Sequence, residues 1–283
     1  MISRRAFNQA ALAAALPAAP ALAKVNSKIK GVQIGVQSYS FRDRSLDQAI
    51  QGMVAVDLGC CELWSGHVEP RDLKGDDLRK WRTTVALKEF ENVRRKFDAA
   101  GIQIYAYNYS FRDNFNDEEI ARGFEMAKAL GVKNLTASSN VTTAKRVDPF
   151  ARKAKIRVGM HNHSNIRDNE FATPQNFEDA MRGMSEYIAI NLDIGHFVAA
   201  GFDPVDYLKK NHRRIVTLHI KDRKKNQGAN LPFGEGDTPI KEVLLALKEN
   251  RFKIPANIEY EYKGSDTIAE VKKCFEYCRR ALA

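Results

Sequence analysis

The stretch YIAINLDIGH, residues 187–196, is an apolar run that ends in a carboxylate and, three residues later, an imidazole. Continuous apolar character over so few residues is typical of a strand that is covered on both faces, as in a parallel sheet. A buried charge is costly unless it is paired or bound to a metal. Asp193 and His196 are therefore expected where this strand leaves the core.

The same pattern of a short apolar run followed by polar residues recurs along the chain. Strands are predicted to begin near residues 33, 59, 102, 133, 157, 188, 215 and 255. Amphipathic segments lie between them, the clearest being 87–101 and 117–131, and both end at a glycine suited to a helix C-terminus. The spacing averages about 32 residues, which is one βα unit.

Eight βα units predict an α/β fold, a single (β/α)8 TIM barrel, over residues 24–283. The main alternative is an open doubly wound sheet. The first predicted βα turn has no glycine-rich dinucleotide fingerprint, and this disfavours the alternative.

Residues 1–23, MISRRAFNQAALAAALPAAPALA, have the Arg-Arg head, apolar run and Ala-Leu-Ala end of a twin-arginine signal peptide. An amphipathic first helix is the alternative, but Pro17 and Pro20 interrupt the run. We expect export to the periplasm or the medium. No later run approaches the roughly 20 apolar residues that span a bilayer, so no membrane insertion of the mature chain is expected.

The chain carries 45 Lys and Arg against 35 Asp and Glu, a net charge of +10, and these charges are scattered. This signals a polyanion-binding surface only weakly, so no nucleic-acid partner is expected. The exception is KDRKK at 221–225, either a solvated face or a contact for an anionic substrate. The four cysteines, at 60, 61, 274 and 278, are expected to be buried and reduced, with a 274–278 bond as the alternative.

Histidines gather at the predicted strand ends, where a barrel of this kind builds its active site. Five of the six follow such an end: His67, His161, His163, His196 and His219. Histidines placed for packing would spread over helices and both barrel faces. The clustering therefore indicates metal ligation or acid-base chemistry.

Four of the strand-end residues form a predicted divalent metal site: His161, Asp193, His219 and Glu259. Imidazole and carboxylate ligands suit Mn²⁺, which we expect first, and also Co²⁺, Mg²⁺, Fe²⁺ or Zn²⁺. Each residue alone has a structural alternative, a hydrogen-bonded core imidazole for His161 and a structural ion pair for either carboxylate. All four being structural together would leave costly unpaired charges.

Two further features are expected at the barrel mouth. SYSFRD at 38–43 and NYSFRD at 108–113 both follow predicted strands and would place aromatic rings and an arginine there, unless the repeat is coincidence. Residues 64–84 are expected to form a lid over the second strand's end, and 227–239 a second such loop.

Several motifs together resemble the sugar phosphate isomerase/epimerase group of the xylose-isomerase-like barrels, over almost the whole mature chain. They are VQSYSFRD, ELWSGH, GVKNLTAS, the HNH of VGMHNHS, NLDIGH, LHIKDR, FGEGD and IEYEY. In that family a carboxylate, an Asp, a His and a Glu from strands five to eight hold a divalent cation, which implies the same four positions here. His161 departs from the pattern, because many members place a glutamate there as one of two paired acid-base groups.

The resemblance implies proton abstraction beside a carbonyl and a metal-stabilised enediolate. Glu259 and His163 are the candidate bases, and Glu62 is the third candidate catalytic residue. The residues expected to bind substrate are His196, Lys221, Arg223, Trp64 and Tyr109.

The expected function is a metal-dependent isomerase or epimerase acting on a sugar or keto-sugar. The alternative is a lyase that performs β-elimination on 3-keto-glycosides at the same metal site. A DNA-processing enzyme and a non-catalytic sugar-binding protein are weaker alternatives. The expected partner is a small-molecule sugar or glycoside, and a homo-oligomer is left open.

Overall fold

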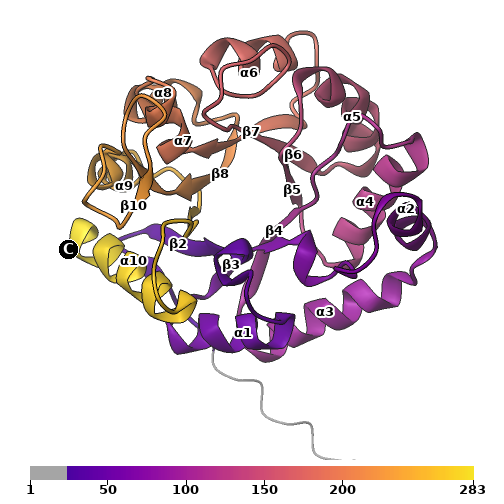
Figure 1. Cartoon of the computed structure of the whole chain (residues 1–283), viewed down its shortest axis with the longest axis horizontal. Helices are drawn as coiled ribbons and strands as arrows, with labels where there is room; N and C mark the ends of the chain where they lie inside the picture. Colours follow the sequence, from indigo (N-terminus) through magenta and orange to yellow (C-terminus); the bar gives the residue numbers. More distant parts are fainter. Residues whose placement is uncertain (1–23) are drawn as a thin grey trace, which may run out of the picture.

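Eight parallel strands close on one another in the order β2-β11-β8-β7-β6-β5-β4-β3, and β3 pairs back onto β2. The computed structural model of the protein describes residues 24–283, and Figure 1 looks down the barrel that these strands enclose. The strands are β2 Val32–Gln37, β3 Cys60–Trp64, β4 Gln103–Asn108, β5 Asn134–Ala137, β6 Arg157–His161, β7 Ile188–Asp193, β8 Ile215–Ile220 and β11 Ala256–Ile258. The predicted (β/α)8 barrel is confirmed. The predicted signal peptide, residues 1–23, lies outside the described residues and stays a prediction.

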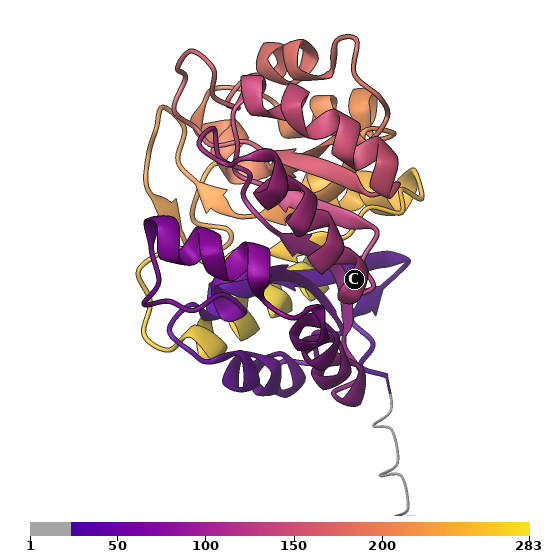
Figure 2. The same cartoon turned by 90° about the vertical axis from the view of Figure 1, so that its right-hand side faces the viewer.

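Helices surround the barrel on all sides (Figures 1 and 2). They are α1 Leu46–Ala55, α2 Gly75–Thr84, α3 Leu87–Ala99, α4 Asp117–Ala129, α5 Val141–Ala154, α6 Pro174–Met181, α7 Ile194–Ala199, α8 Pro204–Asn211, α9 Ile240–Glu249 and α10 Thr267–Leu282. The helices predicted at 87–101 and 117–131 are confirmed as α3 and α4. Gly101 and Gly131 follow them with φ of 70° and 74°, the left-handed conformation that ends a helix.

Two parts of the sequence prediction need correction. The segment 64–84 is not a simple lid loop, because it contains a 3-10 helix, Ser65–His67, and then α2. The last barrel strand, predicted to begin near residue 255, ends at Ile258, although the run ANIEYEY that would form it continues to residue 262. The reason is that the Tyr260 backbone N–H donates to the Ser40 hydroxyl instead of to a neighbouring strand.

Three short strands within residues 24–283 lie outside the barrel. β1 Lys28–Ile29 pairs antiparallel with β2, and β9 Asp222–Arg223 forms a hairpin with β10 Asn230–Leu231. The hairpin begins two residues after β8 and contains part of the loop predicted at 227–239.

The barrel interior is polar near the carboxyl ends of its strands. All of β7 is buried, and its Ile188, Ile190 and Leu192 belong to the hydrophobic core. The alternate residue Asn191 instead reaches the His219 ring on the next strand. Strand alternation thus directs apolar side chains to the helices and polar ones to the barrel axis, where they support the site.

All four cysteines are buried and free, as predicted. No helix within residues 24–283 is long and apolar enough to cross a membrane.

Candidate metal centre

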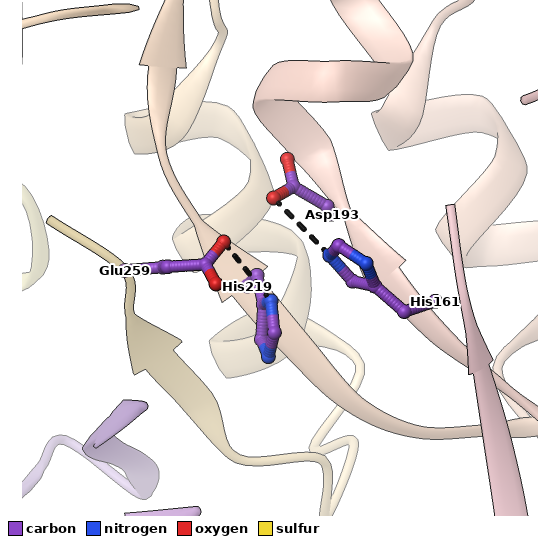
Figure 3. A group of neighbouring side chains, drawn as sticks. All are labelled: His161, Asp193, His219 and Glu259. Atoms are coloured by element: carbon purple, nitrogen blue, oxygen red, sulfur yellow. Dashed lines mark ion pairs between the residues drawn. The ribbon is translucent and has the colours of Figure 1, made fainter. Parts of the chain in front are cut away.

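The four predicted ligands come from the ends of four strands that are close in the barrel. Asp193 pairs in register with His219 on β8, and His219 pairs with Asn257 on β11, two residues before Glu259. His161 ends β6, next to β7. One ligand atom from each of the four residues lies within 4.8 Å of the others, and all four residues are buried (Figure 3).

Asp193 has two roles, one for each carboxylate oxygen. Its Oδ1 accepts a hydrogen bond from the His196 backbone N–H at 2.7 Å and caps the start of α7. Its Oδ2 lies 3.5 Å from His161 Nε2. Gly195 allows the turn to lie against β8, because a Cβ there would meet the Lys221 carbonyl oxygen at 2.7 Å. The NLDIGH motif therefore positions one carboxylate oxygen toward the barrel axis.

His219 is oriented by Glu62. Its Nε2 lies 3.0 Å from both Glu62 oxygens, which leaves Nδ1 facing Glu259 Oε2 at 3.2 Å. Burial lowers the pKa of His219, but the charges of Glu259 and Glu62 outweigh burial and raise it well above its ordinary value.

Glu62 is itself fixed from several sides and fully buried. Gln37 donates to it at 2.8 Å and Thr136 at 2.7 Å. It does not line the cavity beside the cluster, so the structure places this predicted catalytic residue behind His219. Its contacts suit the positioning of a ligand.

The donor set fits a divalent cation. The cluster offers His161 Nε2, Asp193 Oδ2, His219 Nδ1 and Glu259 Oε2. These buried atoms face one another and make no hydrogen bond of good geometry with any described residue, although Lys221 forms ion pairs with both carboxylate oxygens. Buried polar atoms are normally hydrogen-bonded, and four such atoms facing one another are what a bound ion would satisfy. The other ring nitrogen of His161 lies 3.4 Å from the Ser138 hydroxyl.

The fully buried Lys221 brings a positive charge to the cluster. It hydrogen-bonds Glu261 at 2.6 Å and His196 at 3.0 Å. Its ammonium meets Glu259 Oε2 at 2.7 Å and Asp193 Oδ2 at 3.2 Å as ion pairs. Burial lowers the pKa of Lys221, but the three carboxylates outweigh it and raise the pKa above the ordinary value.

The pKa values of the two carboxylates in the cluster are lowered, whereas that of Lys221 is raised. Burial raises the pKa of Asp193, but His196 and Lys221 outweigh it and hold that pKa well below the ordinary range. Burial is likewise outweighed at Glu259, whose pKa is lowered by His219 and Lys221. Both ligand carboxyls are therefore ionised.

His163 and His196 are neutral, in contrast to His219, whose pKa is raised. Burial lowers the pKa of His163 to about 4, with a smaller effect from His161. Burial, assisted by Lys221, also lowers the pKa of His196, which Asp193 opposes only in part. The Arg223 guanidinium approaches His196 Nδ1 at 2.7 Å.

A cavity of about 390 Å³ adjoins the cluster. The sequence-predicted residues that line it are Trp64, His161, His163, His196, His219, Lys221 and Glu259. The others are Gln37, Tyr39, Asn108, Ser110, Arg112, Ser138 and Glu261. The repeated Y-S-F-R-D segments indicated Tyr39 and Arg112. Gln37, Asn108 and Ser138 also lie within the motifs VQSYSFRD, NYSFRD and GVKNLTAS, but none of the three was predicted to bind substrate.

The predicted role of Tyr109 is wrong. It was expected to bind substrate, yet it is 1% exposed, donates to the Glu119 carbonyl and packs edge-on against Phe111. Its neighbour Asn108 takes the cavity-facing position, because successive residues point to opposite sides. The Phe of each repeated segment, Phe41 and Phe111, is also buried in the core.

Arg223 and His67 lie outside the cavity wall. Arg223 reaches the site only through His196 and also donates to Ser164. His67 is held between the Ser38 hydroxyl and the Phe41 carbonyl, a structural role.

Comparison with known proteins gives one family match. The model of a family described as "Xylose isomerase-like TIM barrel" matches residues 54–280. Among curated relatives, an L-ribulose-5-phosphate 3-epimerase UlaE of Escherichia coli (strain ATCC 8739) is 32% identical over 92 residues. That match covers 32% of this chain and 32% of the relative.

Solved structures resemble the whole barrel. A sugar phosphate isomerase/epimerase from Parabacteroides distasonis superimposes with a TM-score of 0.63 and 21% identity, covering 87% of this chain and 95% of that one. An IolI protein with a bound zinc atom gives a TM-score of 0.64 and 15% identity, covering 89% and 96%. At these identities the likeness is one of fold.

Proposed function

The chain belongs to the xylose isomerase-like TIM barrel family, and from this premise we propose that it is a divalent-metal-dependent isomerase or epimerase of a sugar or keto-sugar. The observation that carries the proposal is the convergence of two imidazole nitrogens and two carboxylate oxygens, all from buried residues, within 4.8 Å of one another beside a polar cavity. The partial match to an epimerase and the zinc described for a protein of the same fold support it.

The metal would be held by His161, Asp193, His219 and Glu259. A divalent cation bound there would polarise a substrate carbonyl and stabilise the negative charge of an enediolate. Two nitrogens and two oxygens suit Mn²⁺, Co²⁺, Fe²⁺, Zn²⁺ and, less well, Mg²⁺, with Mn²⁺ as our first expectation.

Proton transfer is assigned to His163 and Glu259. His163 is neutral, lines the cavity and is not one of the four ligands, so its imidazole is free to accept a proton. Glu259 is ionised and follows β11, while His163 follows β6, with β7 and β8 between them. Groups on two sides of a cavity suit epimerisation, in which one face of a carbon loses a proton and the other gains one.

The remaining cavity residues would orient the sugar. Gln37, Asn108 and Ser138 offer hydrogen bonds to hydroxyl groups. The rings of Tyr39 and Trp64 meet edge-on with centroids 5.0 Å apart and form an aromatic wall that suits the apolar face of a sugar ring. The Lys221 ammonium would neutralise charge on a substrate oxygen.

The test is hydrogen exchange into a keto-sugar. The metal-loaded protein is incubated in D₂O with a panel of ketoses, keto-sugars and 3-keto-glycosides, and NMR follows the hydrogens next to the carbonyl. We expect deuterium there and a changed stereocentre or carbonyl position, with both lost in Glu259→Gln. Sugar binding without exchange in the wild-type protein would instead identify a binding protein and end the proposal.

The same experiment separates isomerisation from elimination. Loss of the proton beside a 3-keto group can expel a substituent on the next carbon, so a lyase would release the aglycone of a 3-keto-glycoside. Release with no epimer formed would assign the β-elimination alternative. Export by the predicted signal is part of the proposal and would be checked by fractionating cells that express the full chain.

A further inference from the structure

A second cavity of about 260 Å³ lies next to the first. Trp64, Ser110 and Arg112 line both cavities. The rest of the wall comes from the segment after β3 with α2, from the β4–α4 connection and from α4: Ser65, Gly75, Leu78, Arg79, Arg82, Asn114, Phe115 and Glu119. Ligand pockets span roughly 300–1,000 Å³, so the second cavity is small for a separate site but forms a natural extension of the first.

The charges inside the second cavity are mostly matched. Glu119 is 1% exposed, and its carboxylate lies 2.9 Å from Arg79 and 3.6 Å from Arg82. Arg82 also makes two 2.8 Å hydrogen bonds to the Glu69 carboxylate. These guanidinium groups are held in place by their carboxylates and do not offer an uncompensated positive charge.

Arg112 differs from the other two arginines. It stands on the wall shared by both cavities, is exposed, and forms no ion pair with any residue that the structure describes. The remaining wall is mainly polar, with the Trp64 indole, Leu78 and Phe115 as its apolar part. Hydroxyl, amide and guanidinium groups beside one half-buried indole are a surface that suits a polyhydroxylated ring better than an aryl group.

We propose that the second cavity is a subsite for a second sugar unit, so that the substrate is a disaccharide or longer glycoside rather than a free monosaccharide. The reacting unit lies in the first cavity beside the metal ligands, and the next unit passes Trp64 and Arg112 into the space against α2. The inference rests on the proposed function, because that function places the reacting unit in the first cavity.

A phosphate group is the competing ligand for Arg112. A phosphate carries nearly two negative charges and is usually met by several cationic or backbone donors. Of the three arginines on this wall, Arg112 alone forms no ion pair with a described residue, since Arg79 and Arg82 already share Glu119. The charge balance therefore favours a neutral sugar.

The test uses a substitution on α2 whose side chain fills the second cavity. Leu78→Trp places an indole in the space, and Lys80→Trp, on an exposed position of the same helix, is the matched control. Both variants are first checked for wild-type metal content and melting temperature. The substrates are 3-ketolactose, 3-ketogalactose, which is the same keto unit without the second sugar, and ribulose 5-phosphate, each assayed for kcat/KM by NMR and for binding by calorimetry.

We expect the wild-type protein to prefer 3-ketolactose over 3-ketogalactose by at least about tenfold, the effect of one good added contact. The ratio of kcat/KM for the disaccharide to kcat/KM for the single sugar should fall by a similar factor in Leu78→Trp and stay unchanged in Lys80→Trp. Arg112→Gln should raise KM for 3-ketolactose more than it lowers kcat. Preference for ribulose 5-phosphate that Arg112→Gln removes would overturn the subsite and assign a phosphate site instead.

The two proposals fail in distinguishable ways. Turnover of both keto-sugars with an equal ratio in all variants would overturn the subsite and leave the proposed function standing. Binding of 3-ketolactose without turnover, lost selectively in Leu78→Trp, would overturn the proposed function and support the subsite. No binding of 3-ketolactose to any form would overturn the subsite.

Discussion

At the scale of single residues, the site depends on pairs in which one side chain fixes another. Glu62 holds one ring nitrogen of His219, so that the other faces the cluster. Lys221 supplies the positive charge that Asp193 and Glu259 need in the absence of a cation.

Glu62→Gln is predicted to weaken metal binding by about 10- to 100-fold, the usual cost of losing a carboxylate behind a ligating histidine. The uncharged amide would leave the ring less basic and less firmly oriented. Competitive titration with a fluorescent chelator gives the dissociation constant, and Glu89→Gln on the exposed face of α3 is the control. Equal affinity in all three proteins would show that Glu62 does not act through His219.

Lys221→Met is predicted to destabilise the metal-free protein by about 3–5 kcal/mol, because it leaves two buried carboxylates without their partner. Urea unfolding measures the free energy, and Lys225→Met, at an exposed position, should change it by less than about 0.5 kcal/mol. Adding Mn²⁺ should recover much of the loss in Lys221→Met. A metal-free variant as stable as the control would contradict the role of Lys221.

Some residues of the site could be predicted from the sequence, and others could not. His161, Asp193, His219 and Glu259 could be predicted because each lies at or just after the end of an apolar strand, and strand ends meet at one rim. Tyr109 could not be excluded, because the sequence does not say which of two successive residues faces the axis once a strand has ended. The contacts of Glu62 depend on Thr136 and Asn257, which are distant in sequence.

At the scale of elements, the β7–α7 turn links the fold to the site. Gly195→Ala would push a Cβ to 2.7 Å from the Lys221 carbonyl oxygen, and backbone cannot yield as a flexible side chain can. We predict a loss of stability of about 1–3 kcal/mol, the common cost of overpacking, together with weaker metal binding because Asp193 shifts. Thermal unfolding and metal titration would check this, and wild-type values in both would mean that the close approach is not required.

Elements were predictable where their signals are local. The helices α3 and α4 have clear amphipathic patterns and glycine stops, and α4 begins with an Asn116–Glu119 capping box. Helix α2 was missed because it has few apolar residues and no buried side chain. It packs against α4, and this contact cannot be predicted from the sequence of α2 alone.

At the scale of the whole molecule, buried neutral histidines should make stability depend on pH. Burial lowers the pKa of His67 from 6.5 to about 4. The unfolded chain therefore takes up this proton near pH 6.5, whereas the folded protein resists until about pH 4. The stability that the neutral, buried His67 contributes is complete above pH 6.5 and is lost as the pH falls from 6.5 to about 4.

The metal-free protein is therefore predicted to lose up to roughly 3 kcal/mol of unfolding free energy at this residue between pH 7 and pH 4. Comparison with His67→Gln, which keeps a hydrogen-bonding side chain between Ser38 and Phe41, isolates the effect. Urea unfolding at both pH values should give a shallower decline in the variant. Equal declines would exclude His67 as the source.

The proposed metal centre is one ion held by four residues that are far apart in the chain. The most direct measurement is the metal content of purified, Mn²⁺-loaded protein by mass spectrometry, for the wild type, Asp193→Ala, His219→Ala and the exposed control Asp206→Asn. We predict one equivalent in the wild type and the control and far less than one in the two ligand variants. A full equivalent retained in either ligand variant would contradict the assignment.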